Sequence, residues 1–452
     1  MMQIIASSQL IIIIIGLGVT GMSAARFLAK RSIRFVMMDS RENPPNYEQF
    51  CQEFPNIKCI TGCLDQELLV KADEIIVSPG VNLQTPELTV AVDAGVSIIG
   101  DIELFARYVT KPVIAITGSN AKSTVTTLVG EMAKAQGYSV GVGGNLGVPV
   151  LDMLEGDSFD YFVLELSSFQ LESTFSLSPK VATILNISED HLDRHGSLQA
   201  YHQAKQRIYR HAENIVINRQ DVLTQPPVAN NVTVWSFGND KPDVKGFGLV
   251  KEKQQYHLYY QFTQVAPANE LNVKGKHNYM NALAALAIGT AAEFDLTVMI
   301  EVLKAFRGLP HRCEYIKTVD HVVYINDSKA TNVGATLAAI DGFADENKKN
   351  IVLIAGGQGK GADFSILKSA VKKAVHHVIL IGEDAGKLAL ALGGITEVVN
   401  KATLREAVSA AKDYASPGDI VLLSPACASF DMFSGFAQRG EQFAALVQEV
   451  AA

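Results

Sequence analysis

The segment from Ala115 to Thr124 constrains the fold of this chain more than any other. The apolar run Pro112–Ile116 predicts a short buried strand, and Gly118–Ala121 predicts a tight loop. A helix that Gly137 would end is then predicted by four apolar residues at helical spacing, namely Val125, Leu128, Val129 and Met132. Strand, loop and helix in this order place backbone N–H groups and a helix N-terminus around an anion.

The residues of this loop favour a nucleoside triphosphate as the anion. Lys122 supplies a point charge for the outer phosphates, and the hydroxyl of Ser123 or Thr124 can ligate magnesium. The alternative is an ordinary turn of small residues, which we consider less favoured because the strand and the helix stand where a phosphate loop needs them. Ala121 departs from the pattern, since such loops usually have glycine there. The loop must therefore be strained at Ala121 or turn there with negative φ.

Composition limits the remaining possibilities. A chain of 452 residues suggests about three domains. The net charge of −8, without a basic block, argues against nucleic acid and anionic membranes as general partners. Five cysteines without a CxxC pair fit a reducing cytoplasm. The run Leu10–Ile15 is too short to cross a bilayer, so we expect a buried parallel strand and no membrane insertion.

A second glycine-rich turn follows that first strand. Gly16–Gly21 has the pattern GxGxxG, and Asp39 stands at the end of the next predicted strand, Arg34–Met38. NAD binding is the first interpretation, but the same geometry holds any pyrophosphate-linked nucleotide. Asp39 could accept a hydrogen bond from a ribose hydroxyl or from a uracil N–H. Further strands at 74–77 and 96–99 complete a small α/β unit that ends near residue 101.

Three polar residues stand out in the central part of the chain. Glu165 lies in the apolar run Tyr161–Leu166 at a strand's carboxyl end, where a carboxylate needs a metal or another cation. His191 follows the predicted strand Val181–Leu185 and is either a magnesium or phosphate contact or a solvated loop histidine.

Lys205 is the third of these residues, and it lies on the predicted helix Leu198–His211. It falls on the apolar stripe, where it either snorkels to solvent or is desolvated. A desolvated amine has a lowered pKa and can add carbon dioxide, and the resulting carbamate could ligate a metal.

The rest of the chain predicts antiparallel hairpins, a helix and a second doubly wound sheet. Alternation over Val232–Val273 predicts the hairpins, and a helix follows Gly275. Strands are then predicted at 321–325, 351–355, 378–381, 397–399 and 420–423, with one helix opened by a capping box from Thr403 to Glu406. Polar clusters follow three of these strands, at 326–332, 356–360 and 424–429. Strand ends of one sheet share an edge, so we expect one ligand-binding rim.

These segments resemble the Mur ligases over nearly the whole chain and in the same order. The resemblance is carried by Gly118–Thr124, Leu164–Glu172, Glu189–Asp193, Gly275–Ala282, Leu309–Arg312, Asn326–Asn332 and Ser424–Ser429. It implies an α/β chain of three domains: an N-terminal Rossmann-like domain for a UDP-substrate (1–101), a central P-loop ATPase-type domain with a small β insertion (102–308) and a C-terminal Rossmann-like domain (309–452).

The resemblance also implies a reaction. ATP would phosphorylate the carboxylate of UDP-N-acetylmuramoyl-L-alanine, and the amine of D-glutamate would attack the acyl phosphate to form an amide. Lys122, His191 and Lys205 would be catalytic. Two Mg²⁺ ions would be held by Ser123, Glu165, His191 and a carbamylated Lys205. The resemblance further implies a cytoplasmic enzyme of peptidoglycan precursor synthesis, and we expect a monomer.

The implied binding residues fall into three sets. ATP would contact Gly118, Asn120, Lys122, Ser123, Thr124, Asn278, Arg312, Asp327 and Lys329. The UDP-substrate would contact Gly18, Thr20, Asp39, Ser40, Arg41 and Asn145. D-Glutamate would contact Thr331, Lys360, Ser429 and Phe436.

Three rival functions are weaker. An NAD-dependent oxidoreductase leaves the phosphate loop, Glu165 and Lys205 without a role. A P-loop switch or motor protein leaves the N-terminal nucleotide fold unexplained. A related Mur ligase that adds another amino acid is the nearest alternative, but the DNPR-type signature of the L-lysine and diaminopimelate enzymes is absent.

Overall fold

The computed structural model describes residues 11–156, 158–226, 232–253, 255–273, 275–345 and 347–450. The chain divides into two compact units. The first takes in residues up to Ile187 together with Gln199–Phe237 and Ala284–Met299, and the second takes in Ser188–Leu198, Gly238–Leu283 and the residues from Ile300 onward. Each of the three sheets falls inside one of the predicted domain ranges. The boundaries at residues 101 and 308 stay a prediction.

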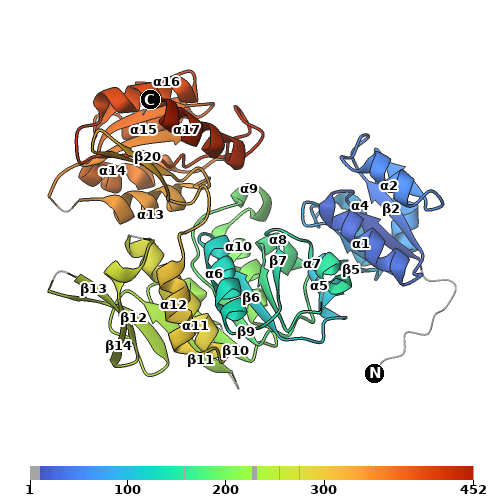
Figure 1. The fold of residues 1–452 in the computed structure, drawn as a ribbon. Coiled ribbons are helices and arrows are strands. Elements are labelled where there is room, and N and C mark those ends of the chain that lie inside the picture. The colour runs from blue at the N-terminus through green and yellow to red at the C-terminus, as the bar shows by residue number, and fades with distance from the viewer. Residues whose placement is uncertain are drawn as a thin grey trace. The chain divides into compact units, whose positions relative to one another are not determined.

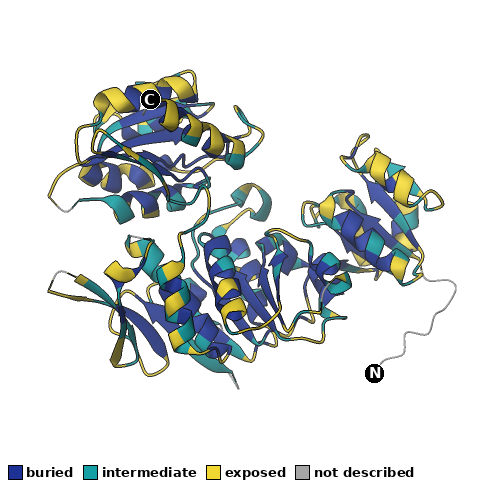
Figure 2. Cartoon of the chain, in the orientation of Figure 1, coloured by how far each residue is buried: buried dark blue, intermediate teal, exposed yellow. Residues whose placement is uncertain are grey.

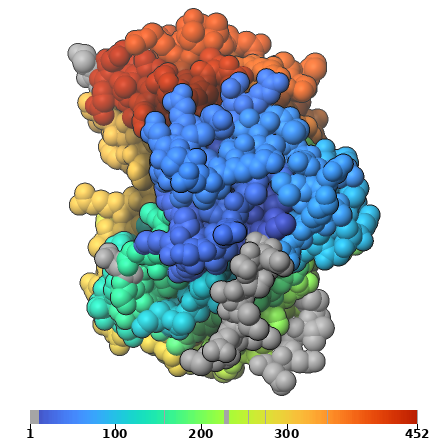
Figure 3. All heavy atoms as spheres, turned by 90° about the vertical axis from the view of Figure 1, so that its right-hand side faces the viewer, coloured from blue at the N-terminus to red at the C-terminus, as the bar shows by residue number. Residues whose placement is uncertain are grey.

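The first sheet is parallel and has the strand order β3-β2-β1-β4-β5. Alternate residues of β1 face two separate cores, because side chains along a strand point to opposite faces. Ile14 packs in one core with Phe27, whereas Ile13 and Ile15 pack in the other. The elements are β1 (Ile12–Ile15), α1 (Val19–Lys30), β2 (Phe35–Asp39), α2 (Tyr47–Glu53), β3 (Cys59–Thr61), α3 (Gln66–Val70), β4 (Glu74–Val77), α4 (Pro86–Asp93), β5 (Ser97–Gly100) and α5 (Asp101–Ala106). In the space-filling view these residues, in blue, form one continuous body (Figure 3).

The phosphate-binding loop belongs to a second parallel sheet of the first unit. Its strands there follow the order β11-β10-β9-β6-β8-β7, and β9, β6 and β8 are buried throughout, drawn dark blue in Figure 2. The elements are β6 (Val113–Thr117), α6 (Lys122–Ala135), β7 (Val140–Gly144), α7 (Val150–Glu155), β8 (Tyr161–Glu165), α8 (Ser168–Glu172), β9 (Val181–Ile184), α10 (Leu198–Gln206), η1 (Arg207–Tyr209), β10 (Asn214–Asn218), η2 (Val222–Thr224) and β11 (Thr233–Gly238). The sequence analysis did not predict β7 or β10.

The second unit holds the antiparallel segment and the third sheet (Figure 1). The predicted antiparallel hairpins are confirmed for β12 (Gly246–Glu252), β13 (Gln255–Tyr260) and β14 (Thr263–Pro267). The prediction was wrong for β11, which lies in the same predicted segment but pairs parallel with β10. They are followed by η3 (Ala268–Glu270), α11 (Lys276–Ala291) and α12 (Leu296–Ala305). The short helix α9 (Leu192–His195) also belongs to this unit.

The third sheet has the order β15-β16-β20-β17-β18-β19. Its five predicted strands are confirmed and run parallel, but an unpredicted edge strand, β15, pairs antiparallel with β16. The elements are β15 (Glu314–Val319), β16 (Val322–Asn326), α13 (Val333–Phe343), β17 (Ile351–Gly356), η4 (Phe364–Leu367), α14 (Lys368–Ala374), β18 (Val375–Ile381), α15 (Ala385–Leu392), β19 (Glu397–Asn400), α16 (Leu404–Tyr414), β20 (Ile420–Leu423) and α17 (Phe436–Val450).

The predicted capping box of α16 forms in a modified way. The Thr403 side chain accepts from the Glu406 N–H as expected, whereas the Glu406 carboxylate accepts from the Ala402 N–H. A full capping box, not predicted, opens α8, where the Ser167 side chain accepts from the Gln170 N–H and the Gln170 side chain accepts from the Ser167 N–H. No helix within the described residues is long and apolar enough to cross a membrane.

Candidate active site

The phosphate-binding loop joins β6 to α6, as predicted, and it is strained at Ala121. Ala121 has φ 67° and ψ −3°, in the left-handed region. Its β-carbon crowds the following carbonyl there, at a cost of about 1–2 kcal/mol relative to an unstrained backbone. Of the two ways to accommodate alanine at this position, the structure has the strained one.

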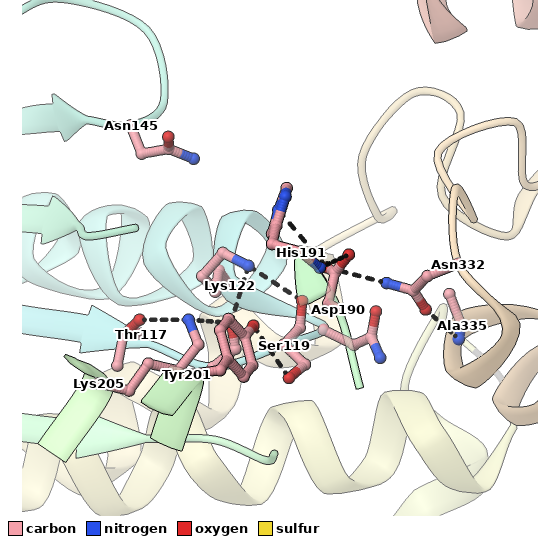
Figure 4. Close-up of polar contacts among 12 residues, drawn as sticks. Thr117, Ser119, Lys122, Asn145, Asp190, His191, Tyr201, Lys205, Asn332 and Ala335 are labelled. Atoms are coloured by element: carbon pink, nitrogen blue, oxygen red, sulfur yellow. Dashed lines mark hydrogen bonds and ion pairs between the residues drawn. The ribbon is translucent and has the colours of Figure 1, made fainter. Parts of the chain in front are cut away.

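Lys122 folds over the loop that precedes it. Its Nζ donates to the carbonyl oxygens of Gly118 at 2.8 Å and Ser119 at 3.0 Å (Figure 4). The loop is held from the other side by Asn186, which the sequence analysis did not single out. The Asn186 carbonyl accepts from the Ser119 N–H at 2.9 Å, and its side-chain oxygen accepts from the Asn120 N–H at 2.8 Å. Asn186 lies two residues after the end of β9, near the strand end where polar residues of a parallel sheet collect.

Lys205 is buried at the same loop, with 1% of its surface exposed. Its Nζ donates to Thr117 Oγ1 at 3.1 Å and to the Gly118 carbonyl at 3.0 Å (Figure 4). The Tyr201 ring centroid lies 4.7 Å from this nitrogen, and the Tyr201 hydroxyl is 3.1 Å from Ser119 Oγ. The snorkelling interpretation is therefore wrong, because the amine is directed into the protein and not to solvent.

Glu165 is buried at the carboxyl end of β8, as predicted. Its Oε1 accepts from Asn145 Nδ2 at 2.7 Å, whereas its Oε2 is buried with no hydrogen-bond partner among the described residues. An orphaned carboxylate oxygen in a protein interior fits a bound cation. Ser123, also buried, is the second residue of helix α6.

The described residues contain no group of three His, Cys, Asp or Glu side chains that could hold a metal. Mg²⁺ commonly takes only one or two protein ligands and completes its shell with phosphate oxygens and water. Glu165 and Ser123 fit that mode of binding.

One cavity of about 720 Å³ brings together all six residues predicted to contact the UDP-substrate. Gly18, Thr20, Asp39, Ser40, Arg41 and Asn145 all line it. The segment Ser78–Asn82 and Gln170 line it as well and were not predicted. Ser78, Pro79 and Gly80 follow β4, so their position at a strand end was the available signal.

Asp39 organises this cavity from within the protein. Its carboxylate accepts from the Leu17 N–H at 2.7 Å, and both its oxygens accept from the Arg41 guanidinium, at 2.9 and 2.7 Å. Burial raises the pKa of Asp39, but the hydrogen bonds from Arg41 and Leu17 outweigh it, and the net pKa is lowered. Asp39 therefore fixes the glycine-rich loop and the guanidinium beside it.

In the second unit, Asp327 follows β16 and is buried. Its carboxylate accepts from Ser424 Oγ at 2.8 Å and from the Cys313 N–H at 3.2 Å. Burial raises the pKa of Asp327 to about 7, partly offset by these bonds and by the nearby Arg312 guanidinium. The predicted rim thus joins the ends of β16 and β20 directly.

The remaining predicted residues of the second unit follow strands β16, β17 and β20 or lie on helices α11 and α17. The Lys329 ammonium sits 3.7 Å from the centroid of the Phe436 ring, and Thr331 lies two residues further on. Ser429 is buried after β20, and Lys360 is exposed after β17 with φ 51°. Asn278 is in the first turn of α11, where its N–H donates to the Gly275 carbonyl.

His191 precedes α9 in a left-handed conformation with φ 54°. Its N–H donates to Asp190 Oδ1 at 3.0 Å, and Asp190 Oδ2 accepts from Asn332 Nδ2 at 3.3 Å (Figure 4). These contacts join the segment around His191 to the start of α13 within the second unit. They do not decide between the two interpretations of His191, and its role stays a prediction.

The fold and the two nucleotide-type loops define a multidomain α/β protein built around a phosphate-binding loop. Family models match most of the chain: a MurD-like Mur ligase N-terminal domain over residues 11–100, a Mur ligase middle domain over 116–289 and a Mur ligase glutamate ligase domain over 311–427. The chain belongs to the Mur ligase family.

Curated relatives match over the full length. UDP-N-acetylmuramoylalanine–D-glutamate ligases of Pseudomonas fluorescens and Pseudomonas aeruginosa are 51% and 52% identical, with 100% of each chain covered. The Acinetobacter baylyi ligase of the same name is 51% identical over 96% of this chain and 97% of its own.

Solved structures agree in fold at lower identity. A pseudomurein peptide ligase from Methanothermus fervidus has a TM-score of 0.61 at 21% identity, covering 98% of this chain and 100% of its own. A UDP-N-acetylmuramate–alanine ligase from Thermotoga maritima has a TM-score of 0.59 at 21% identity with the same coverage. The predicted α/β class is confirmed by the sheets described above.

Proposed function

We propose that this chain is an ATP-dependent ligase that adds D-glutamate to UDP-N-acetylmuramoyl-L-alanine in peptidoglycan precursor synthesis. The observation that carries this proposal is the full-length identity of 51–52% with ligases of that name. The second candidate is a related ligase that adds a different amino acid to a UDP-linked acceptor. It is weaker because the full-length curated relatives reported above all carry the D-glutamate name.

The chemistry begins with activation of a carboxylate, which is a poor electrophile until it is phosphorylated. ATP transfers its γ-phosphoryl group to the substrate carboxylate, and the D-glutamate amine then displaces phosphate to form the amide. Lys122 neutralises charge on the outer phosphates, and the backbone N–H groups of the strained loop bind phosphate oxygens. The strong contacts of Lys122 and Asn186 with this loop support a rigid phosphate site, since they fix its conformation in advance.

Magnesium supplies charge neutralisation of the phosphates when it is bound. Glu165 and Ser123 would hold one ion, which the buried and unpartnered Glu165 Oε2 supports. His191 and a carbamylated Lys205 would hold a second. The complete burial of Lys205 supports carbamylation, because a desolvated amine is the more readily neutral and nucleophilic one.

The binding assignments follow the family pattern. The UDP-substrate set lines one cavity of suitable size, with the Arg41 guanidinium available to a diphosphate or uracil. The Lys360 ammonium would form an ion pair with a carboxylate of D-glutamate. Thr331, Ser429 and Phe436 would contact the same substrate. We further propose a monomer that acts in the cytoplasm on small-molecule substrates.

Phosphate release from Mg·ATP tests the proposal. The purified chain is mixed with UDP-N-acetylmuramoyl-L-alanine and, in parallel, D-glutamate, L-glutamate, L-alanine, L-lysine or diaminopimelate. The expected result is release that requires both the UDP-substrate and D-glutamate. Release with another amino acid would establish the second candidate instead, and release without an acceptor would point to a plain ATPase.

A further inference from the structure

Arg439 is buried in the second unit without any role in the assignments above. It lies on α17, three residues after the start of that helix at Phe436, and 1% of its surface is exposed. It is among the largest fully buried side chains of the chain. An arginine this deeply buried must use its donors within the protein, because desolvating the guanidinium is costly.

Its strongest contacts go to the loop that follows β16. Arg439 Nη2 donates to the Ser328 carbonyl at 2.8 Å, and Nε donates to Ser328 Oγ at 3.0 Å. Ser328 Oγ in turn donates to the Phe436 carbonyl at 2.8 Å. Ser328 is therefore fixed by the helix at both its backbone and its side chain, between Asp327 and Lys329.

The same guanidinium reaches the loop that follows β20 and Gly356, the last residue of β17, from which the next loop starts. Nη2 donates to the Cys427 carbonyl at 3.1 Å, and Nη1 makes longer contacts with the carbonyls of Gly356 at 3.4 Å and Ala428 at 3.5 Å. The two loops also pair with each other, since the N–H groups of Gln358 and Ala428 each donate to the other's carbonyl at 2.9 Å. One side chain thus contacts three separate strand-end loops.

The acceptors are neutral oxygens. Within the described residues no carboxylate oxygen lies within 4.0 Å of the Arg439 guanidinium, so it forms no ion pair there. A core that needed only volume would be filled more cheaply by an apolar side chain. What arginine adds is a planar fork whose donors point in fixed, divergent directions. That geometry suits the alignment of several loops.

We infer that Arg439 is a positioning residue that sets the three strand-end loops carrying the D-glutamate-binding residues. The inference rests on the proposed function for the identity of the amino acid. Thr331, Lys360 and Ser429 each lie on one of the loops that Arg439 contacts, and Phe436 begins its own helix. Arg439 touches no substrate itself and acts through the backbone of these loops.

Steady-state kinetics of Arg439→Lys and Arg439→Ala test this role. The expected result is a rise of at least tenfold in KM for D-glutamate, a smaller rise in KM for ATP, and a KM for the UDP-substrate that stays within twofold. Arg405→Gln is the matched control, because Arg405 is an exposed arginine of the same sheet's helix α16, paired with Glu449. It should leave all three constants unchanged.

Chemical rescue separates positioning from simple core filling. Millimolar guanidinium should restore part of the D-glutamate affinity of Arg439→Ala, whereas urea at the same concentration should not, because it is similar in shape but uncharged. An unchanged KM for D-glutamate in folded Arg439→Lys, or equal effects of guanidinium and urea, would overturn the inference.

Amide hydrogen exchange keeps the test independent of the reaction. In Arg439→Lys, residues 327–332, 357–362 and 424–431 should exchange faster than in wild type, while amides of β17 and β18 stay protected. Wild-type protein that lacks D-glutamate-dependent phosphate release would overturn the proposed function alone. Exchange in those three segments that matches wild type would overturn the positioning role alone.

Discussion

Two loops of the first unit share one backbone plan and differ in how they are charged. The glycine-rich loop after β1 and the phosphate-binding loop after β6 each connect a buried parallel strand to a helix. The first is fixed by a carboxylate, since Asp39 accepts from the Leu17 N–H. The second is fixed by two lysine side chains, since the Nζ atoms of Lys122 and Lys205 both donate to the Gly118 carbonyl.

Under the proposed function, this difference would let one fold element serve two ligand chemistries. At the first loop, Asp39 forms an ion pair with Arg41. The cavity there would need only to bind and orient the UDP-substrate. At the second, the Lys122 ammonium would neutralise phosphate charge during transfer. The strand–loop–helix backbone predicts that an anion binds at both loops. The side chains around each loop would decide whether the bound group also reacts.

The largest effect is expected at Lys122. Lys122→Ala removes the charge next to the outer phosphates and should lower kcat by about 100- to 1000-fold, as the loss of a charge-stabilising group does. The measurement is D-glutamate-dependent phosphate release. Lys134→Ala is the control, because Lys134 is an exposed lysine on the same helix, paired with Glu131. Equal activity of the two variants would contradict a role of Lys122 in neutralising phosphate charge, and with it the difference proposed between the two loops.

The second-largest loss of activity is expected at Lys205. Lys205→Ala removes the buried amine, and with it any carbamate, so we expect a fall of about 10–100-fold, typical of residues that support a metal site. Wild-type enzyme freed of carbon dioxide should regain activity with bicarbonate, whereas Lys205→Ala should respond to chloride but not to bicarbonate. Wild-type activity that is indifferent to bicarbonate would reject carbamylation.

Asp39 probes the first loop. Asp39→Asn weakens the hydrogen bonds with the Leu17 N–H and the Arg41 guanidinium. It should raise KM for the UDP-substrate by about tenfold, which corresponds to about 1.4 kcal/mol. KM for ATP should stay constant. Glu53→Gln, which breaks the exposed pair with Arg26 in the same sheet's helices, is the control.

The pH dependence of stability sharpens the same test. The folded pKa of Asp39 is lowered, so its ion pair stabilises the protein above the unfolded pKa of about 3.9 and loses that contribution as pH falls through the folded value. The difference in unfolding free energy between wild type and Asp39→Asn should be about 1–2 kcal/mol at pH 7. Urea denaturation should show that this difference in unfolding free energy vanishes at acid pH. A difference that grows on acidification would contradict a stabilising ion pair at Asp39.

The smallest effect is expected at Ala121. Ala121→Gly relieves the left-handed strain, worth about 1–2 kcal/mol, but glycine loses about 0.4–1 kcal/mol in conformational entropy on folding. The variant should therefore be more stable by roughly 0–1.6 kcal/mol in urea denaturation, with turnover nearly unchanged. A clear loss of stability would mean that the loop needs the methyl group for packing.

Much of the fold could be predicted because buried strands and turn residues are local signals. The strands around Ile14, Ile116 and Leu164 were found from apolar runs alone. The strands that were missed carry weak local signals. β7 is rich in glycine, β10 is bounded by asparagines, and β15 is an exposed edge that alternates only loosely.

The candidate site was predictable in part for the same reason. Lys205 stood out as a charged residue on an apolar stripe, and its burial is confirmed. Asn186, Gln170 and Arg439 carry no local anomaly that points to a role, because asparagine, glutamine and arginine are ordinary in loops and on helices.

The sequence by itself determined the succession of strands, loops and helices and the positions of the phosphate-binding groups, since these depend on neighbours along the chain. The tertiary structure alone decided the strand orders, the left-handed turn at Ala121, the use of Asp39 to hold Leu17, and the alignment of three loops by Arg439. Each of these depends on groups far apart in sequence, such as Arg439 and Ser328, that burial forces to satisfy one another.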